Sequence, residues 1–331
     1  MNPLQPSYIS LYKCGELEKR AERLWQRLAS CDICPRECGV DRLAGEKGFC
    51  HSGYKPIVAS VCDHHGEEPV LSDRRGSGTI FFGNCNLRCR YCQNHQISQD
   101  YEAQKANETD CHSLARCMLH LQNDLGCHNI NLVSPSHFVP QIVKALLEAI
   151  PMGLKVPLVY NTNAYDSLKT LRELDGVIDI YLPDLKYASD DYARKFSRAH
   201  EYVHHSRNAV KEMYRQVGEL VVDESGIARR GLIVRHLILP NRIAGSRESL
   251  LWLSREVSPR VAVSLMSQYH PMHKAYKHEL LSRPIRLSEY NEALQAMEAA
   301  GLEEGWAQKL TSHRNYLPDF ERDDHPFRLG V

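Results

Sequence analysis

Three closely spaced cysteines are the residues of this sequence best suited to carry chemistry. They are Cys85, Cys89 and Cys92, in the pattern C-x3-C-x2-C. Three thiolates on one loop can hold three corners of a [4Fe–4S] cluster, which leaves the fourth iron open to a small molecule. The alternatives are a zinc loop or three buried thiols. Zinc loops favour two cysteine pairs, and no second pair follows between Asn94 and Gln99, so the spacing favours the cluster.

The sequence around these cysteines resembles the radical S-adenosylmethionine (SAM) superfamily. Tyr91 is the aromatic residue before the last cysteine, and the segments GSGTIFF (76–82) and CQNHQIS (92–98) resemble relatives of pyruvate formate-lyase activating enzyme. The resemblance covers about residues 28–320. It implies a [4Fe–4S] cluster and S-adenosyl-L-methionine as cofactors, with a reductant such as flavodoxin or ferredoxin. One-electron cleavage of SAM would then give a 5′-deoxyadenosyl radical that abstracts hydrogen.

A second cysteine cluster lies closer to the N-terminus. Cys31, Cys34, Cys38 and Cys50 follow the pattern C-x2-C-x3-C-x11-C, and the proline and glycines among them predict a loop rather than a helix. Four thiolates can close a structural zinc site or hold a second iron–sulfur cluster. We slightly favour a closed structural site over a cluster, but the spacing does not decide the metal. Four unrelated thiols are the remaining alternative.

Composition limits the class of protein. The chain has 331 residues, and its 41 basic residues balance 41 acidic ones, so the net charge favours neither nucleic acid nor an anionic membrane. No apolar run approaches the ~18 residues that a membrane span needs. Seven of the twelve cysteines fall in the two clusters, and residues 1–20 show no export signal. We therefore expect a cytoplasmic protein with metal-bound cysteines rather than a disulfide framework.

Alternating apolar and amphipathic segments from residue 79 onward predict an α/β fold. The strand-like segments are 79–82, 129–133, 158–161, 178–182, 232–239 and 262–266. The helical segments are 112–126, 139–150, 166–174, 190–216, 246–256 and 288–300. Six such repeats agree with the partial (β/α)6 TIM-like barrel that the resemblance implies.

Three further regions surround this barrel, which we expect to span residues 76–300. Residues 1–30 contain an N-terminal helix at 14–30, residues 31–75 form a cysteine-rich extension and connector, and residues 301–331 form a C-terminal tail. The connector contains His64, His65 and Glu67. These side chains either lie near the substrate or belong to a solvated turn.

Polar residues at the carboxyl ends of the strands are the candidate cofactor ligands, because barrels carry function at that edge. Ser134 and Ser136 stand where the activating enzymes have a Gly-Gly-Glu element, and we expect them to contact SAM. Asp184 and Lys186 match an Asp-x-Lys element of those enzymes. The resemblance implies that Lys186 neutralises the SAM carboxylate while Asp184 orients polar partners; the alternative is a strand-end salt bridge.

Four more residues complete the predicted cofactor site. Asn161 ends the third strand, and His236 lies in the fifth, where it either reaches the cofactor or is a satisfied core histidine. Tyr91 either packs near the adenine or fills space under the cluster. Asn94 is placed to hydrogen-bond a cluster sulfur.

Three functions compete at this point. The first is a radical SAM enzyme that installs a glycyl radical on a partner protein. The second is the same chemistry on another protein residue or on a small molecule, because the Gly-Gly-Glu element is missing and the N-terminal cysteine cluster is added. The third is a non-catalytic metal-binding scaffold. We expect no nucleic-acid partner, since the chain has no basic run.

Overall fold

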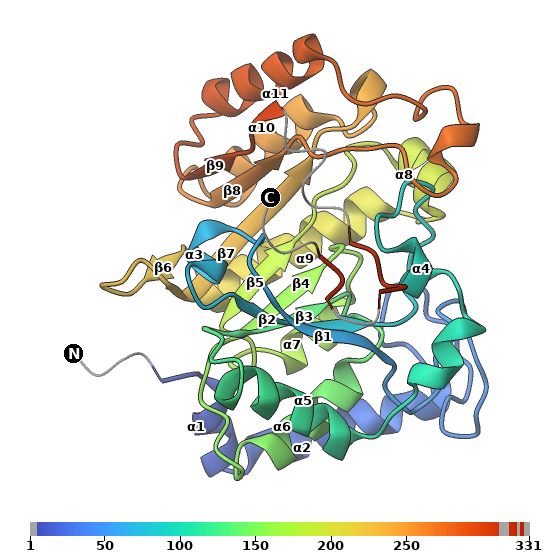
Figure 1. The fold of residues 1–331 in the computed structure, drawn as a ribbon, viewed down its shortest axis with the longest axis vertical. Coiled ribbons are helices and arrows are strands. Elements are labelled where there is room, and N and C mark those ends of the chain that lie inside the picture. The colour runs from blue at the N-terminus through green and yellow to red at the C-terminus, as the bar shows by residue number, and fades with distance from the viewer. Residues whose placement is uncertain (1–4, 311–317, 323–324, 328–331) are drawn as a thin grey trace.

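The computed structural model describes residues 5–310, 318–322 and 325–327. Its centre is a largely parallel sheet in the order β1-β2-β3-β4-β5-β7-β8-β9, with β6 paired to β7 (Figure 1). The strands are β1 (Val58–His64), β2 (Ser77–Phe82), β3 (Ile130–Val133), β4 (Leu158–Thr162), β5 (Ile180–Pro183), β6 (Val221–Val222), β7 (Ala228–Leu237), β8 (Ala262–Met266) and β9 (Gly305–Ala307).

Helices follow most of the parallel strands, as βα repeats require. They are α1 (Tyr8–Lys13), α2 (Glu16–Gln26), α3 (Pro69–Ser72), α4 (His95–Ser98), α5 (Cys111–Asn123), α6 (Val139–Ala149), α7 (Leu168–Glu173), α8 (Asp190–Ser197), α9 (Tyr202–Val217), α10 (Ser246–Glu256) and α11 (Leu287–Ala299). All six predicted strands are present as β2, β3, β4, β5, β7 and β8, and they pair in parallel. The predicted α/β partial barrel is therefore confirmed.

Two edge strands are absent from the sequence prediction. β1 pairs antiparallel with β2, and β9 pairs parallel with β8. β1 falls in the segment that we expected to be a loop-rich connector, and β9 falls in the expected C-terminal tail. Both are only partly buried. An edge strand with one covered face, or with three residues, lacks the continuous apolar run that marks a central strand.

The N-terminal helices belong to the outer layer of the barrel. The helix expected at 14–30 is α2, which begins after Gly15, a residue in the left-handed conformation at φ 73°, and ends in a 3-10 turn. Leu17, Ala21 and Leu24 are buried on one face of α2, and α2 packs against α6 (Figure 1). The chain then enters the N-terminal cysteine cluster at Cys31, directly after the 3-10 turn.

The long helix expected at 190–216 is divided into α8 and α9. The division occurs where Arg198 and Glu201 adopt left-handed backbone conformations, at φ 52° and 48°. Helical periodicity continues through this corner, so the pattern of apolar residues does not reveal it. The turn brings Ser197 toward the loop that carries Cys89, where it contributes to the site.

Two global features accompany this fold. No helix in the described ranges is both long and apolar enough to cross a bilayer. None of the twelve cysteines, all of which lie in the described ranges, forms a disulfide bond.

Candidate functional site

The loop between β2 and α4 carries the first cysteine motif into a cavity at the carboxyl edge of the sheet. Cys85, Cys89 and Cys92 all line this cavity, which we call the barrel-mouth cavity. The loop leaves the strand through Asn84, whose backbone is left-handed at φ 64°. Its backbone amide donates to the carbonyl of Ile97 at 2.8 Å, which ties the loop to the start of α4. Cys89 and Cys92, four and seven positions after Cys85, therefore face the same cavity as Cys85.

Each cysteine sulfur has a polar neighbour from elsewhere in the barrel. Ser197 Oγ donates to Cys89 Sγ at 3.0 Å, and Ser98 Oγ lies 3.2 Å from Cys92 Sγ. Asn163 Nδ2 lies 3.6 Å from Cys85 Sγ. Hydrogen bonds to ligand sulfurs orient them and tune the potential of an iron–sulfur cluster.

Without a metal, the environment of Cys85 and Cys92 favours the protonated thiol. Burial and the neighbouring Cys89 raise the pKa of Cys92 to about 12, and the same two causes raise the pKa of Cys85. A thiolate forms in such a site when a positive metal centre stabilises it. In the described residues, no three Cys, His, Asp or Glu side chains are close enough to hold a single metal ion. The three thiols line one cavity from a single loop, a donor set that fits three corners of an iron–sulfur cluster.

An ion-pair network lines the cavity beside the cysteines. Arg235 Nε lies 2.7 Å from Asp184 Oδ1, and its Nη2 donates to Asn161 Oδ1 at 2.5 Å. On its other side, Asp184 Oδ2 lies 2.7 Å from Lys186 Nζ. Burial opposes ionisation of Asp184, but the charges of Arg235 and Lys186 outweigh it and lower its pKa. The predicted strand-end pair is thus part of a larger network of charged groups facing the cavity.

Two adjacent glutamates from the connector complete this network. Glu67 Oε2 lies 3.3 Å from Arg235 Nη1, and its Oε1 lies 3.6 Å from His64 Nδ1. Burial favours protonation of Glu67, but His64 and Arg235 outweigh it and lower its pKa to about 2. Burial raises the pKa of Glu68 to about 7 against the charge of Arg235. Glu68 Oε2 is buried with no hydrogen-bond partner among the described residues, so it is available to a ligand.

His64 and Glu67 therefore lie at the site, whereas His65 does not. The His65 side chain is 40% exposed and pairs with Asp63 at 3.0 Å. The expectation of a solvated turn holds for His65 and is wrong for Glu67. The two residues differ because the chain pairs as β1 up to His64 and then turns back toward the sheet, which places Glu67 at the cavity. The sequence analysis did not predict β1.

Six predicted cofactor ligands line the barrel-mouth cavity: Tyr91, Asn94, Ser134, Asn161, Asp184 and Lys186. Tyr91 is buried and packs edge-on against Tyr187 and Tyr269, with ring centroids 6.4 and 5.9 Å away. It forms part of the floor beneath the cysteines. The sequence analysis expected Asn94 to hydrogen-bond a cluster sulfur. In the structure, the backbone amide of Asn94 interacts with Cys92. Cofactor binding by these six residues stays a prediction.

Two predicted ligands lie outside the cavity, and we correct those expectations. His236 is fully buried, with Nδ1 2.8 Å from Leu185 O and Nε2 2.9 Å from Ser246 Oγ. Of the two alternatives, cofactor ligand or core histidine with its hydrogen bonds satisfied, the structure shows the second. Side chains alternate along a strand, so Arg235 faces the cavity while His236 faces the helices. Ser136 is buried with its Oγ 3.0 Å from Thr162 Oγ1.

Arg235 and Glu68 are the two residues that the sequence analysis missed. The alternation of β7 could have found Arg235, because a basic residue between apolar neighbours on a buried strand needs an interior partner. Glu68 had no comparable signal, since it lies just before α3, whose Leu71 packs with Ala228 and Ile233 of the distant strand β7.

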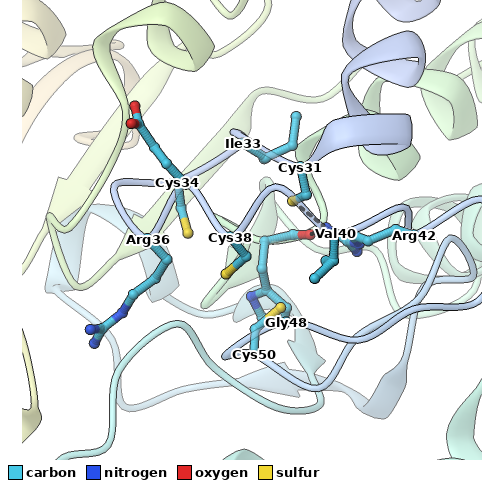
Figure 2. A pocket seen from close by; sticks show the side chains of 11 residues that line it. Cys31, Ile33, Cys34, Arg36, Cys38, Val40, Arg42, Gly48 and Cys50 are labelled. Atoms are coloured by element: carbon cyan, nitrogen blue, oxygen red, sulfur yellow. Dashed lines mark hydrogen bonds between the residues drawn. The ribbon is translucent and has the colours of Figure 1, made fainter.

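The four N-terminal cysteines line a separate cavity, which we call the four-cysteine cavity (Figure 2). Cys31, Cys34 and Cys50 are buried, and Cys38 is half-buried. The backbone amide of Phe49 donates to Cys38 Sγ at 3.4 Å. The four cysteines thus line one cavity, and metal binding there stays a prediction.

Comparisons with known proteins agree with this arrangement. Residues 79–223 match the family model of the Radical SAM superfamily. The chain is 28% identical over 300 residues to the uncharacterized protein MJ0674 of Methanocaldococcus jannaschii, a match that covers 89% of this chain and 82% of the relative. It is 31% identical over 91 residues to the uncharacterized protein MJ0808 of the same organism, which covers 24% of this chain and 27% of that protein.

A solved structure of TYW1 with a lysine-pyruvate adduct bound is also similar, with a TM-score of 0.38 and 9% identity. That match covers 68% of this chain and 74% of the other, and its score is too low to establish a shared fold. The family match includes β2 with the cysteine motif and β3, β4 and β5 with the polar strand ends. The three cysteines at the mouth of the partial barrel agree with this match, and the chain therefore contains a radical SAM domain over residues 79–223.

Proposed function

We propose that this enzyme cleaves S-adenosyl-L-methionine at a [4Fe–4S] cluster held by Cys85, Cys89 and Cys92, and that it then abstracts hydrogen from a polar substrate. The observation that supports this most is the sharing of one cavity by the three thiols and the network of Lys186 and Arg235. The cluster supplies the electron and an open iron. The chain supplies the positions of the ligands, the charges around them and a site shielded from water.

Lys186 is the residue that we assign to the SAM carboxylate. Its side chain is 15% exposed, and its Nζ is held 2.7 Å from Asp184 Oδ2. Asp184 is in turn fixed by Arg235, so the ammonium is positioned before any ligand arrives. A preformed cation saves the entropy of ordering a long side chain on binding. Ser134 and Asn161 line the same cavity and add hydrogen-bonding groups.

The substrate that we propose is polar, and within that class we favour a glycine-containing segment of a partner protein. Glu68 offers an unpaired buried oxygen that can accept a hydrogen bond from an N–H or O–H group. A backbone amide beside the target glycine would satisfy it, as in the glycyl-radical activation that the sequence resemblance suggests. The reductant would be a one-electron carrier such as flavodoxin or ferredoxin.

The same chemistry on another protein residue or on a small molecule is the second candidate. It is favoured by Ser134-Pro-Ser-His137 in place of the Gly-Gly-Glu element and by the added four-cysteine cavity. Either substrate must still meet the charged groups around Glu67 and Arg235.

The test is anaerobic reconstitution with iron and sulfide, followed by reduction with dithionite in the presence of SAM. We expect 5′-deoxyadenosine, detected by mass spectrometry, from the wild type and from Cys117→Ala. Cys117 lies on α5, outside the barrel-mouth cavity, and serves as the matched control. Cys89→Ala should form none. A reconstituted wild type that carries its iron and still leaves SAM intact would refute the proposal and favour a metal-binding scaffold.

A second assay separates the two substrate classes. The reduced enzyme, SAM and a glycyl radical enzyme from the same genome should give a glycine-centred doublet in electron paramagnetic resonance. Normal 5′-deoxyadenosine formation without that doublet would favour the second candidate.

A further inference from the structure

The four-cysteine cavity is a feature that SAM cleavage does not use. Figure 2 shows Cys31, Cys34, Cys38 and Cys50 around one space. Backbone hydrogen bonds close the loop that carries the first three: Cys31 N donates to Val40 O, and Gly39 N donates to Cys31 O, both at 3.0 Å. A hydrophobic cluster has no need to gather four thiols in this way.

The fourth cysteine reaches this space because the chain passes very close to the third. A Cβ atom at Gly48 would lie 2.7 Å from both Cβ and Sγ of Cys38. Only glycine allows this approach. The Phe49 amide then donates to Cys38 Sγ, and Cys50 follows on the far side of the cavity. The loop is therefore built to bring sulfur atoms together.

A buried positive charge beside the thiols indicates that the occupied site is anionic. Arg42 lines the cavity and is 1% exposed. Among the described residues, its hydrogen-bond acceptors are Gly53 O, His137 O and, at 3.9 Å, Cys31 Sγ. A buried guanidinium without a carboxylate is costly unless another anion compensates it. Four thiolates around a metal centre supply that negative charge, whereas four protonated thiols do not.

The spacing of the four sulfurs distinguishes a single ion from a cluster. A tetrahedral zinc ion, with each sulfur at about 2.3 Å, draws its four sulfurs to within about 4 Å of one another. In the part of the chain that the structure describes, no three potential ligands are close enough to hold one ion. The same holds for Cys85, Cys89 and Cys92, which line their own cavity. A cluster, whose several irons accept ligands farther apart than one ion does, is therefore favoured over a single zinc ion for the four-cysteine cavity.

We propose that Cys31, Cys34, Cys38 and Cys50 bind a second [4Fe–4S] cluster, in which every iron has a cysteine ligand. Because no iron is left open, this cluster does not bind SAM. Its binding is independent of the reaction proposed above, because it needs only these four thiolates and the charge of Arg42.

The second cluster would also stabilise the conformation of the loop that carries Cys85, Cys89 and Cys92. Arg36, between Cys34 and Cys38, donates from Nε to Asn86 O at 2.9 Å, and Asn86 follows Cys85 directly. The ring of Phe49 lies between the guanidinium groups of Arg36 and Arg88, at 3.7 and 4.3 Å. These contacts join the two cysteine loops, so metal at one site stabilises the shape of the other.

The experiment compares the wild type with the triple variant Cys85→Ala, Cys89→Ala, Cys92→Ala, which leaves the N-terminal cysteines intact. After anaerobic reconstitution, we expect about eight irons per wild-type chain and about four irons and four sulfides per triple-variant chain. On reduction, the triple variant should give a cluster signal in electron paramagnetic resonance that SAM does not change. The wild type should show a second signal that SAM does change.

A single substitution keeps the test decisive if the triple variant does not fold. Cys34→Ser should leave about four irons and the SAM-sensitive signal only, while the matched control Cys117→Ser should keep about eight. One zinc per chain, with no iron in the triple variant, would overturn the proposal in favour of a structural zinc site. A wild type with about four irons and no zinc would overturn it in favour of four free thiols.

Discussion

Removing Arg235 tests whether the charged network at the barrel mouth is a unit. Arg235 is 15% exposed and contacts Asp184, Glu67 and Asn161 from one side of β7. Arg235→Met keeps most of the side-chain volume and removes the charge. Asp184 and Glu67 are then left buried, with side chains 18% and 8% exposed.

The size of the effect follows from what each carboxylate retains. Removing one partner of a buried pair costs about 3–5 kcal/mol, because the other charge stays desolvated. Asp184 keeps Lys186 at 2.7 Å, and Glu67 keeps His64 at 3.6 Å. We therefore expect a loss near the lower end, about 3 kcal/mol in the free energy of unfolding, rather than the sum for two pairs.

The loss should also depend on pH. The pKa of Glu67 is lowered from 4.5 to about 2. A carboxylate with a lowered pKa stabilises the fold above its ordinary pKa, and this stabilisation is lost as the pH falls toward the folded value. Arg235→Met removes part of that stabilisation. The difference between variant and wild type should therefore be largest near neutral pH and should narrow as the pH falls below 4.5.

Denaturant unfolding under anaerobic conditions measures both effects, with Arg229→Met as the matched control. Arg229 lies on the same strand and pairs with Asp223, but both side chains are 27% exposed. Such a pair is worth about 0–1 kcal/mol. Equal losses for Arg235→Met and Arg229→Met, or a difference that stays constant with pH, would refute the reasoning.

Three further predictions concern single residues of the site. Lys186→Ala should weaken SAM binding at least tenfold in isothermal titration of the reconstituted enzyme, because it removes the positioned cation; unchanged affinity would exclude that role. The pKa of Glu68 is raised from 4.5 to about 7, so the wild type loses stability as the pH rises from 4.5 through about 7. Glu68→Gln lacks this titration, and its free energy of unfolding should therefore gain about 2.5 kcal/mol relative to the wild type between pH 5 and pH 8. A difference in denaturant unfolding that does not change with pH would contradict the burial of this charge. His236→Phe should lower the unfolding midpoint while the affinity for SAM stays the same, and a selective loss of affinity would return His236 to the cofactor site.

The barrel could be predicted from the sequence because its central strands are buried on both faces. Segments such as 158–161 and 262–266 are continuous apolar runs, and those in β4 and β8 are buried throughout. The edge strands β1 and β9 could not be predicted in the same way. Their stability comes from pairing with β2 and β8, which is a property of the assembled sheet and not of their own residues.

The candidate site likewise contains residues that could be predicted from local sequence and residues that could not. The cysteine motif was identified from its spacing, and the Asp184–Lys186 pair from the family resemblance and its place at a strand end, because each lies within a few residues on one loop or strand end. Arg235 was missed because it meets Asp184 only after β7 is folded beside β5. Glu68 was missed because it comes under the charge of Arg235 only in the folded chain. The choice of His236 over Arg235 was a difference of one residue, which on a strand reverses the direction of the side chain.

Taken alone, the order of residues determined the chemistry that the protein can host. C-x3-C-x2-C places three thiols on one loop whatever surrounds it, and four more cysteines within twenty residues predict a second cysteine-rich loop. Only the tertiary structure decided which charges face those thiols, because ion pairs such as Arg235 with Asp184 join residues 51 positions apart. The local spacing of cysteines determines which metal centre a loop can bind. The packing of distant strands determines the polarity and charge of the cavity around that centre.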